Sequence, residues 1–216
     1  MEMQAFQRAG ARSRACELLV SGIGPMEAAF SLTYRLGRGM SDLQGVVHFG
    51  VAGAYHRLQG PGADMLDICL AQEEVLADMG VCCSDTIEHF SAPELGVGNY
   101  FSLDNALRQK VAALFTAKKI AFHQGRFLTV SCVSGTRKRG DMLAEQFDGL
   151  CENMEGAAVA RVCEAFGLPC LEIRCISNFV EDRNTGRWRL KEACRKAGTT
   201  AALVVGHLVE TLNLEP

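Results

Sequence analysis

The chain has 216 residues, of which 48% are hydrophobic and 22% charged, as in an ordinary globular domain. Its net charge of -3 argues against nucleic acid as a partner, and no run approaches the ~20 apolar residues that cross a membrane. The ten cysteines include no C-x-x-C pair, and no hydrophobic leader opens the chain, so we expect a cytoplasmic protein without a metal site. Because repeats and linkers are absent, residues 1–216 are predicted to form a single domain.

The N-terminal part opens with a basic segment at 1–15 that does not resemble a strand. A short strand is expected at 17–20, followed by the turn SGIGP at 21–25 and then by a helix. The apolar stripe of this helix consists of Ala28, Ala29, Leu32 and Leu36. The two glycines of the turn could hold a phosphate with their amides or simply allow a strand-to-helix turn, and the sequence leaves both open.

The next strand is expected at 46–49 and ends in the motif GVAG at 50–53. Small residues at this strand end let a flat ring lie close to the backbone. Gly50, Val51 and Ala52 are therefore candidate ligand-binding residues. His48 lies in the apolar part of the strand, so it is predicted to be a buried histidine with polar partners.

The middle of the chain alternates between strand and helix patterns. We expect a strand at 65–71 and a long loop at 80–101, of the kind that often carries function. A helix is predicted at 103–119 and a strand at 125–133. The polar run SGTRKR at 134–139 is expected to be a turn and a solvated loop.

A loop, a helix and a buried strand are predicted within residues 151–178. The apolar stripe of the helix consists of Ala158, Val159, Val162, Cys163 and Phe166. Gly167 should end the helix as a left-handed cap, and Pro169 cannot continue it. The mostly apolar run at 171–176 is typical of a strand that is covered on both faces.

Three polar residues in this unit are candidates for a site. Glu155 lies at the helix start, where a carboxylate is favoured, and Arg174 lies inside the apolar strand, where a charge needs a partner. Asn178 follows the strand, and ligands of open α/β sheets bind beyond the carboxyl ends of strands. The alternatives are a simple helix-start charge, a structural ion pair and a turn residue.

The C-terminal part begins with a polar loop at 180–187. It leads to Trp188, which is the only tryptophan and stands among charged residues. A tryptophan in such a place suggests stacking or an interface, and the alternative is a packing residue at a helix start. An amphipathic helix at 190–212 is expected to cover one face of the sheet.

These motifs resemble those of the nucleoside phosphorylase and nucleosidase superfamily, and within it the futalosine hydrolase family. The resemblance rests on NMEGAA at 153–158 and EIRCISN at 172–178. Further similar motifs, in the same order and spacing, are SGIG at 21–24, GVAG at 50–53, QEEVLADMGV at 72–81 and Trp188. The resemblance implies a single α/β domain with a mixed twisted sheet surrounded by helices.

The resemblance also implies a difference at the N-terminus. Members of the superfamily open with a hydrophobic strand and a catalytic glutamate, and residues 2–6 resemble the segment that begins with this glutamate. The strand before it is missing here, so we expect either a start codon placed too late or a truncated form. The alternative for Glu2 is a disordered terminal residue.

The site residues that the resemblance implies have distinct roles. Glu155 would hold the ribose 2′-hydroxyl and stabilise positive charge at the anomeric carbon, Arg174 would orient a carboxylate and the water, and Glu2 would be the general base. The remaining candidate substrate contacts are Ser134, Gly135, Met154, Ser177 and Trp188. No cofactor or metal is implied, and the family's assembly predicts at least a homodimer.

Two departures from the superfamily pattern indicate the reaction. Phosphorylases hold phosphate with an arginine and a serine where this chain has His48 and Val51, which favours hydrolysis. Adenine-cleaving members have an aspartate where this chain has Asn178, whose NH2 group can donate to O6 of a 6-oxopurine. The sequence therefore predicts release of hypoxanthine from futalosine. The alternatives are an adenine-cleaving methylthioadenosine or aminofutalosine nucleosidase, a phosphorylase, and a catalytically weak purine-nucleoside-binding protein.

Overall fold

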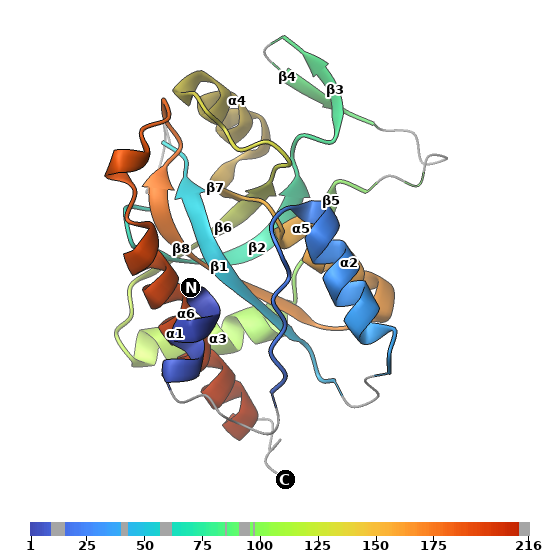
Figure 1. Cartoon of the computed structure of the whole chain (residues 1–216), viewed down its shortest axis with the longest axis vertical. Helices are drawn as coiled ribbons and strands as arrows, with labels where there is room; N and C mark the ends of the chain where they lie inside the picture. The colour runs from blue at the N-terminus through green and yellow to red at the C-terminus, as the bar shows by residue number, and fades with distance from the viewer. Residues whose placement is uncertain are drawn as a thin grey trace.

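The structure of the chain is a computed structural model that describes residues 1–9, 16–39, 43–56, 62–84, 86–90, 96 and 98–211 (Figure 1). Its centre is a mixed sheet with the strand order β5–β2–β6–β7–β1–β8. The strands are β1 (Val46–Ala54), β2 (Ile68–Leu76), β5 (Tyr100–Ser102), β6 (Phe122–Thr129), β7 (Gly149–Asn153) and β8 (Cys170–Phe179). Strand β8 runs parallel to β1 and also pairs with β2, which closes the sheet toward a barrel.

Helices cover both faces of this sheet (Figure 1). The helices α2 (Pro25–Leu36) and α5 (Gly156–Phe166) pack on one face, and α3 (Asn105–Ala117) and α6 (Leu190–Thr211) pack on the other. Two further helices, α1 (Glu2–Arg8) and α4 (Arg137–Phe147), lie on α6 and over one end of the sheet. The predicted α/β class with a mixed sheet surrounded by helices is confirmed. None of the described helices is long and apolar enough to cross a membrane.

The local patterns near the carboxyl ends of β1 and β8 predicted most elements correctly. The predicted stripe of α2 is buried at Ala28, Leu32 and Leu36, and Gly167 ends α5 with a φ of 65°. Residues 170–177 of β8 are fully buried because the strand lies between the two helical layers. The one residue of the α5 stripe that was placed wrongly is Phe166, which is 45% exposed at the last turn.

Other predicted elements were wrong. Residues 16–24 contain no strand, and none of them pairs in the sheet. Among the described residues no strand precedes β1. The loop expected at 80–101 contains a hairpin, β3 (Gly80–Cys83) and β4 (Thr86–His89), as well as β5. Within the polar loop at 180–187, a short 3-10 turn, η2 (Thr185–Arg187), precedes α6.

Charged residues hid two elements from the sequence patterns. Strand β2 continues through the acidic residues Glu73 and Glu74, because one pairs with Arg126 and the other is buried among polar groups. The basic run at 137–139 begins α4 rather than a loop. Its start is capped by the hydroxyl of Thr136, which accepts a hydrogen bond from the Arg139 amide.

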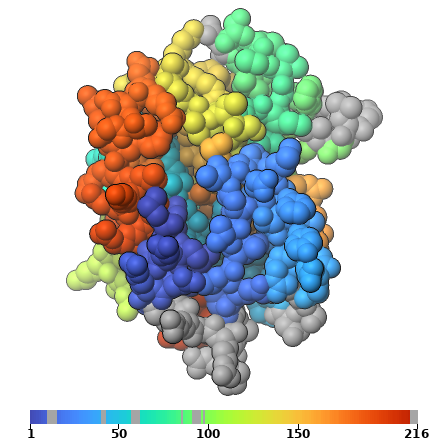
Figure 2. Space-filling model, in the orientation of Figure 1, coloured from blue at the N-terminus to red at the C-terminus, as the bar shows by residue number. Residues whose placement is uncertain are grey.

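The N-terminal helix α1 is docked closely on α6. Gly198 of α6 makes this contact possible, since an added Cβ there would lie 2.3 Å from the carbonyl oxygen of Glu2. Phe6 is 1% exposed and its ring stacks on Phe49 of β1 at 5.4 Å. In Figure 2 the surface is hollowed between this helix, the segment before α2 and the segment after β8.

Candidate active site

A cavity of about 1240 Å³ opens beside β1, between α1, residues 16–23 and the end of β8. Nearly all of the predicted site residues line it. They are Glu2, Gly50, Val51, Ala52, Ser134, Met154, Glu155, Arg174, Ser177, Asn178 and Trp188. Gly135 is the exception, because it is exposed and its carbonyl accepts a hydrogen bond from the Arg183 amide at 3.2 Å.

Arg174 forms the floor of the cavity and is 3% exposed. It lies opposite Gly50 in the parallel register, where any added Cβ would be 2.6 Å from its Nη1. The guanidinium donates from Nε to Glu172 at 2.7 Å and from Nη1 to Glu155 at 3.2 Å. Burial would lower the pKa of Arg174, but these two carboxylates outweigh it and raise the pKa. The predicted need for a charged partner is therefore met twice.

Glu155 caps the start of α5 without a capping hydrogen bond of its own side chain. One carboxylate oxygen accepts from Arg174 and the other accepts from the amide of Gly24 at 3.1 Å. Gly24 has a φ of 89°, a conformation that favours glycine. The glycine turn before α2 thus donates to a side-chain carboxylate of the protein and uses the backbone freedom of glycine, although the described residues before it do not form the strand that the predicted strand-to-helix turn required.

A buried polar layer beneath Arg174 was missed by sequence reasoning. Asn153 accepts with Oδ1 from the amides of Glu155 and Gly156 and from Arg174, and its Nδ2 donates to Glu74 at 2.6 Å. Glu172 and Glu74 are 1% and 0% exposed. One signal was present in the sequence: Glu172 and Arg174 are two residues apart in an apolar strand, which places both charges on one face.

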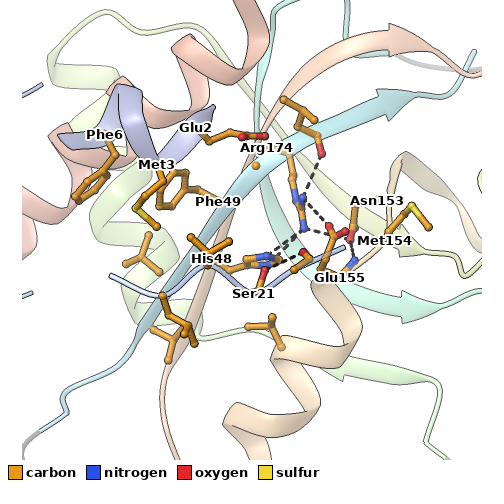
Figure 3. Close-up of a pocket in the computed structure, with 18 of the residues that line it drawn as sticks. Glu2, Met3, Phe6, Ser21, His48, Phe49, Asn153, Met154, Glu155 and Arg174 are labelled. Carbon is orange, nitrogen blue, oxygen red and sulfur yellow. Dashed lines mark hydrogen bonds and ion pairs between the residues drawn. The ribbon is translucent and has the colours of Figure 1, made fainter. Parts of the chain in front are cut away.

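His48 lies at the edge of this layer with its side chain 10% exposed. Its Nδ1 is 3.4 Å from a carboxylate oxygen of Glu172, and its ring nitrogens lie 3.4 and 3.5 Å from Nη2 of Arg174. It has the polar partners that were predicted, and it also lines the cavity (Figure 3).

The opposite end of the cavity is formed by the loop after β6 and the end of β8. Ser134 donates from its amide and its hydroxyl to Glu152, a buried residue that sequence reasoning also missed. Asn178 lies inside β8, accepts from the Ser177 hydroxyl at 2.8 Å and donates to the Phe179 carbonyl at 3.0 Å.

Two groups form the rim of the cavity. Trp188 is half-buried, and the Arg183 guanidinium lies 5.1 Å from the centre of its ring. Glu2 points from α1 into the cavity (Figure 3). Burial acts to raise the pKa of Glu2, but hydrogen bonds from its own amide and from Cys194, with the terminal amino group, lower it. Glu2 is therefore placed as a carboxylate at neutral pH.

The family follows from a match over almost the whole described chain. Residues 15–210 match the family model described as the phosphorylase superfamily. The chain belongs to this superfamily.

Curated members of the superfamily include two similar enzymes. The futalosine hydrolases of Thermus thermophilus and Streptomyces coelicolor are each 34% identical to this chain. The matches cover 81% and 82% of this chain, and 74% and 73% of the relatives. The predicted resemblance to the futalosine hydrolase family is thereby confirmed.

Solved structures of the superfamily have the same fold. A 5′-methylthioadenosine/S-adenosylhomocysteine nucleosidase from Helicobacter pylori, solved with butyl-thio-DADMe-Immucillin-A, superimposes with a TM-score of 0.78. It is 20% identical and the match covers 95% of this chain and 94% of that structure. At this identity the likeness concerns the fold, and the chemistry of the site rests on the residues described above.

Proposed function

We propose that this protein hydrolyses the N-glycosidic bond of futalosine and releases hypoxanthine and dehypoxanthine futalosine, a step of menaquinone biosynthesis. The observation that carries the proposal is one cavity that holds Glu155 on Arg174, Glu2 on its rim and Asn178 at its far end. The similarity to two futalosine hydrolases supports the choice of substrate.

Glu155 and Glu2 would have different roles at the sugar. Glycosidic cleavage passes through a ribose with positive charge at the anomeric carbon, which a fixed negative charge stabilises. Glu155 is held by two donors, so its carboxylate is fixed before the substrate binds, and it would bond the ribose 2′-hydroxyl with Met154 packed against the sugar. Glu2, with its lowered pKa, is ionised and would accept a proton from the attacking water.

Asn178 would recognise the leaving base. The Ser177 hydroxyl donates to Oδ1 of Asn178, which turns the NH2 group toward donation. One N–H bonds the Phe179 carbonyl, and the second remains to donate to O6 of hypoxanthine. Ser134 and Trp188 would complete the base end. The backbone of Gly50 and Ala52 would line the ring, and Val51 would give no hydroxyl to phosphate.

The first test is release of free base from futalosine, aminofutalosine, methylthioadenosine and inosine, with and without phosphate. We expect hypoxanthine from futalosine at a rate independent of phosphate. Adenine release would instead support the adenine-cleaving alternative. If nothing is released but hypoxanthine binds, the protein is a binding protein, and the proposal is wrong.

The role of Asn178 has its own test. Asn178→Asp should lower kcat/KM for hypoxanthine release by about 10²-fold or more, because a carboxylate meets O6 lone pair to lone pair. The matched control is Asn184→Asp, at an exposed asparagine that caps η2 and keeps its acceptor after the change. Equal rates for both variants would remove Asn178 from base recognition.

We also propose that two copies of the chain pair through an apolar patch on α2 and the residues before it. The patch consists of Val20, Ile23, Met26, Phe30 and Tyr34, all more than half exposed. Three of these side chains follow helical spacing on α2, which is typical of a face that packs against another surface. The patch adjoins the cavity through Ile23, so a second copy would border each site.

Light scattering tests this pairing. Phe30→Asp should convert a dimer into a monomer, whereas Phe166→Asp, at an exposed phenylalanine of α5 outside the patch, should leave the dimer intact. A wild-type monomer would contradict the proposal.

We further propose that residues 1–216 form a single domain, which should unfold in one cooperative transition. The ten free thiols, six of them buried, support a reducing, cytoplasmic setting.

A further inference from the structure

Two buried carboxyl groups meet beneath the proposed catalytic residues, and the mechanism above uses neither. Glu74 lies on β2 and Glu172 lies on β8, and these two strands pair in the sheet. Both lie against the backbone of Gly156. A Cβ added there would be 2.0 Å from a carboxyl oxygen of Glu74 and 2.6 Å from one of Glu172. Two carboxylates so close and so buried cannot both be ionised, so the pair must hold one proton.

The hydrogen-bond partners show which group is charged. Glu172 accepts from the Arg174 guanidinium at 2.7 Å and faces His48 at 3.4 Å, so its partners favour the ionised form. Glu74 accepts from two neutral groups, the hydroxyl of Thr129 at 2.7 Å and the amide of Asn153 at 2.6 Å. Within the part of the chain that the structure describes, the one charged group bonded to Glu74 is Glu172, which favours the protonated form of Glu74.

The electrostatics agree with this assignment. Burial and the charge of Glu172 raise the pKa of Glu74 well above its usual value. Burial acts to raise the pKa of Glu172 as well, but Arg174, His48 and the hydrogen bond from Glu74 lower it to about 2. The titratable groups around the pair are Arg174, His48, Glu155, Cys151 and Cys170.

Two chains of hydrogen bonds lead from the pair to Glu155. Glu74 bonds Nδ2 of Asn153, which turns Oδ1 of Asn153 toward the Glu155 amide and toward Arg174. Glu172 holds Nε of Arg174, whose Nη1 bonds the Glu155 carboxylate. The backbone and the side chain of Glu155 are thus fixed from the same buried pair.

We propose that Glu74 and Glu172 are positioning residues that share one proton: Glu74 is the neutral member, which orients Asn153 by accepting from its Nδ2, and Glu172 is the charged member, which orients Arg174. The effect on turnover rests on the proposed function, whereas the sharing of the proton does not. The pair carries one negative charge, which neutralises the positive charge of Arg174 beneath the cavity. The negative charge of Glu155 can therefore stabilise the positive charge on the ribose.

Conservative variants distinguish the two members of the pair. Glu74→Gln keeps a neutral donor and an acceptor, so kcat should stay within about threefold, whereas Glu74→Leu should lose tenfold or more because Asn153 is released. Glu172→Gln removes the charge on Arg174's partner and should lower kcat at least tenfold with a smaller change in KM. The matched control is Glu73→Gln, the adjacent residue, which pairs with Arg126.

The outcomes that overturn the proposal are specific. If Glu74→Gln is as damaging as Glu74→Leu, Glu74 is ionised and the proton is assigned wrongly. If Glu172→Gln is as mild as Glu74→Gln, Glu172 is not the partner that orients Arg174. Thermal unfolding of every variant separates a loss of fold from a loss of positioning.

Infrared spectroscopy tests the shared proton without any turnover. At pH 8 the wild type should show the carbonyl band of a protonated carboxyl group, and this band should be lost in Glu74→Gln but retained in Glu73→Gln. A wild type without the band contradicts the pair even if the enzyme is active. A wild type with the band that cleaves no nucleoside leaves the pair in place and rejects the proposed function instead.

Discussion

The floor and the rim of the cavity place their functional groups by different means. On the floor, Glu155 and Arg174 are fixed by a buried network in which each charge has at least two hydrogen-bonding partners. On the rim, Glu2 depends on the docking of α1 against α6, and Trp188 depends on contacts with exposed residues. A buried charge must be fully partnered, so its geometry is set many times over, whereas a rim group depends on a few contacts. Changes on the floor should therefore have large effects and changes on the rim graded ones.

The largest effect is expected from Glu155→Gln. The amide has nearly the same shape but no negative charge to stabilise the positive ribose, so kcat should fall by about 10²–10³-fold. Steady-state kinetics with futalosine measures this change, and binding of hypoxanthine should be unaltered. A loss of less than fivefold would show that the floor does not provide the electrostatic stabilisation.

The next effect concerns stability in acid. The folded-state pKa of Glu172, about 2, lies below the unfolded value of about 4.3, so its stabilisation is present above that value and is lost as the pH falls from about 4.3 to 2. The loss should reach about 3 kcal/mol at most. Urea unfolding at several pH values measures it.

Variants of the carboxyl pair provide the comparison. Glu172→Gln should show a flatter dependence of the unfolding free energy in this pH range. Glu74 has the opposite sign: its raised pKa gives stabilisation that is present below about pH 4.3 and is lost as the pH rises. The advantage of Glu74→Gln over the wild type should therefore grow with pH, and parallel curves for all three proteins would contradict the shared proton.

A graded effect is expected on the rim from Gly198→Val. The new side chain would meet the Glu2 carbonyl and Ala5, which pushes α1 away from α6 and displaces Glu2. We expect kcat to fall about tenfold or more with little change in hypoxanthine binding, since a general base contributes 10²–10⁴-fold when it is well placed.

The control for this variant lies in the same helix. An added Cβ at Gly206 meets nothing within 4 Å, so Gly206→Ala should keep full activity and gain roughly 0.5–1 kcal/mol of stability. If both glycine variants are fully active, the docking of α1 does not position Glu2 for catalysis.

The smallest effect is expected from Arg183→Ala. The guanidinium over the Trp188 ring contributes about 0.5–1 kcal/mol at an exposed site, so its loss should raise KM two- to fivefold and leave kcat unchanged. The same kinetic assay measures it. A fall in kcat instead would mean that this part of the rim acts on the reacting groups.

Local patterns were sufficient where one segment supplies its own signals. The helix at 156–166 and the strand after it follow from the apolar stripe, Gly167 and an apolar run, and they place Glu155 and Arg174. Elements with charged residues were missed. Strand β2 runs through Glu73 and Glu74 because Arg126 and Thr129, which are distant in the chain, bond these carboxyl groups. Helix α4 begins at Arg137 within a basic run, and Arg139 of that run pairs with the distant Asp78.

The sequence by itself determined the superfamily, the α/β class and most of the candidate residues that line the cavity, because motifs and periodicity are local properties of the chain. Only the tertiary structure decided which groups are the partners of the buried carboxyl groups. It brings the Gly24 amide to Glu155 across 131 residues and places Glu74 beside Glu172 against Gly156. The protonation of a buried group depends on the partners that surround it in space, and those partners come from strands that are far apart in the chain.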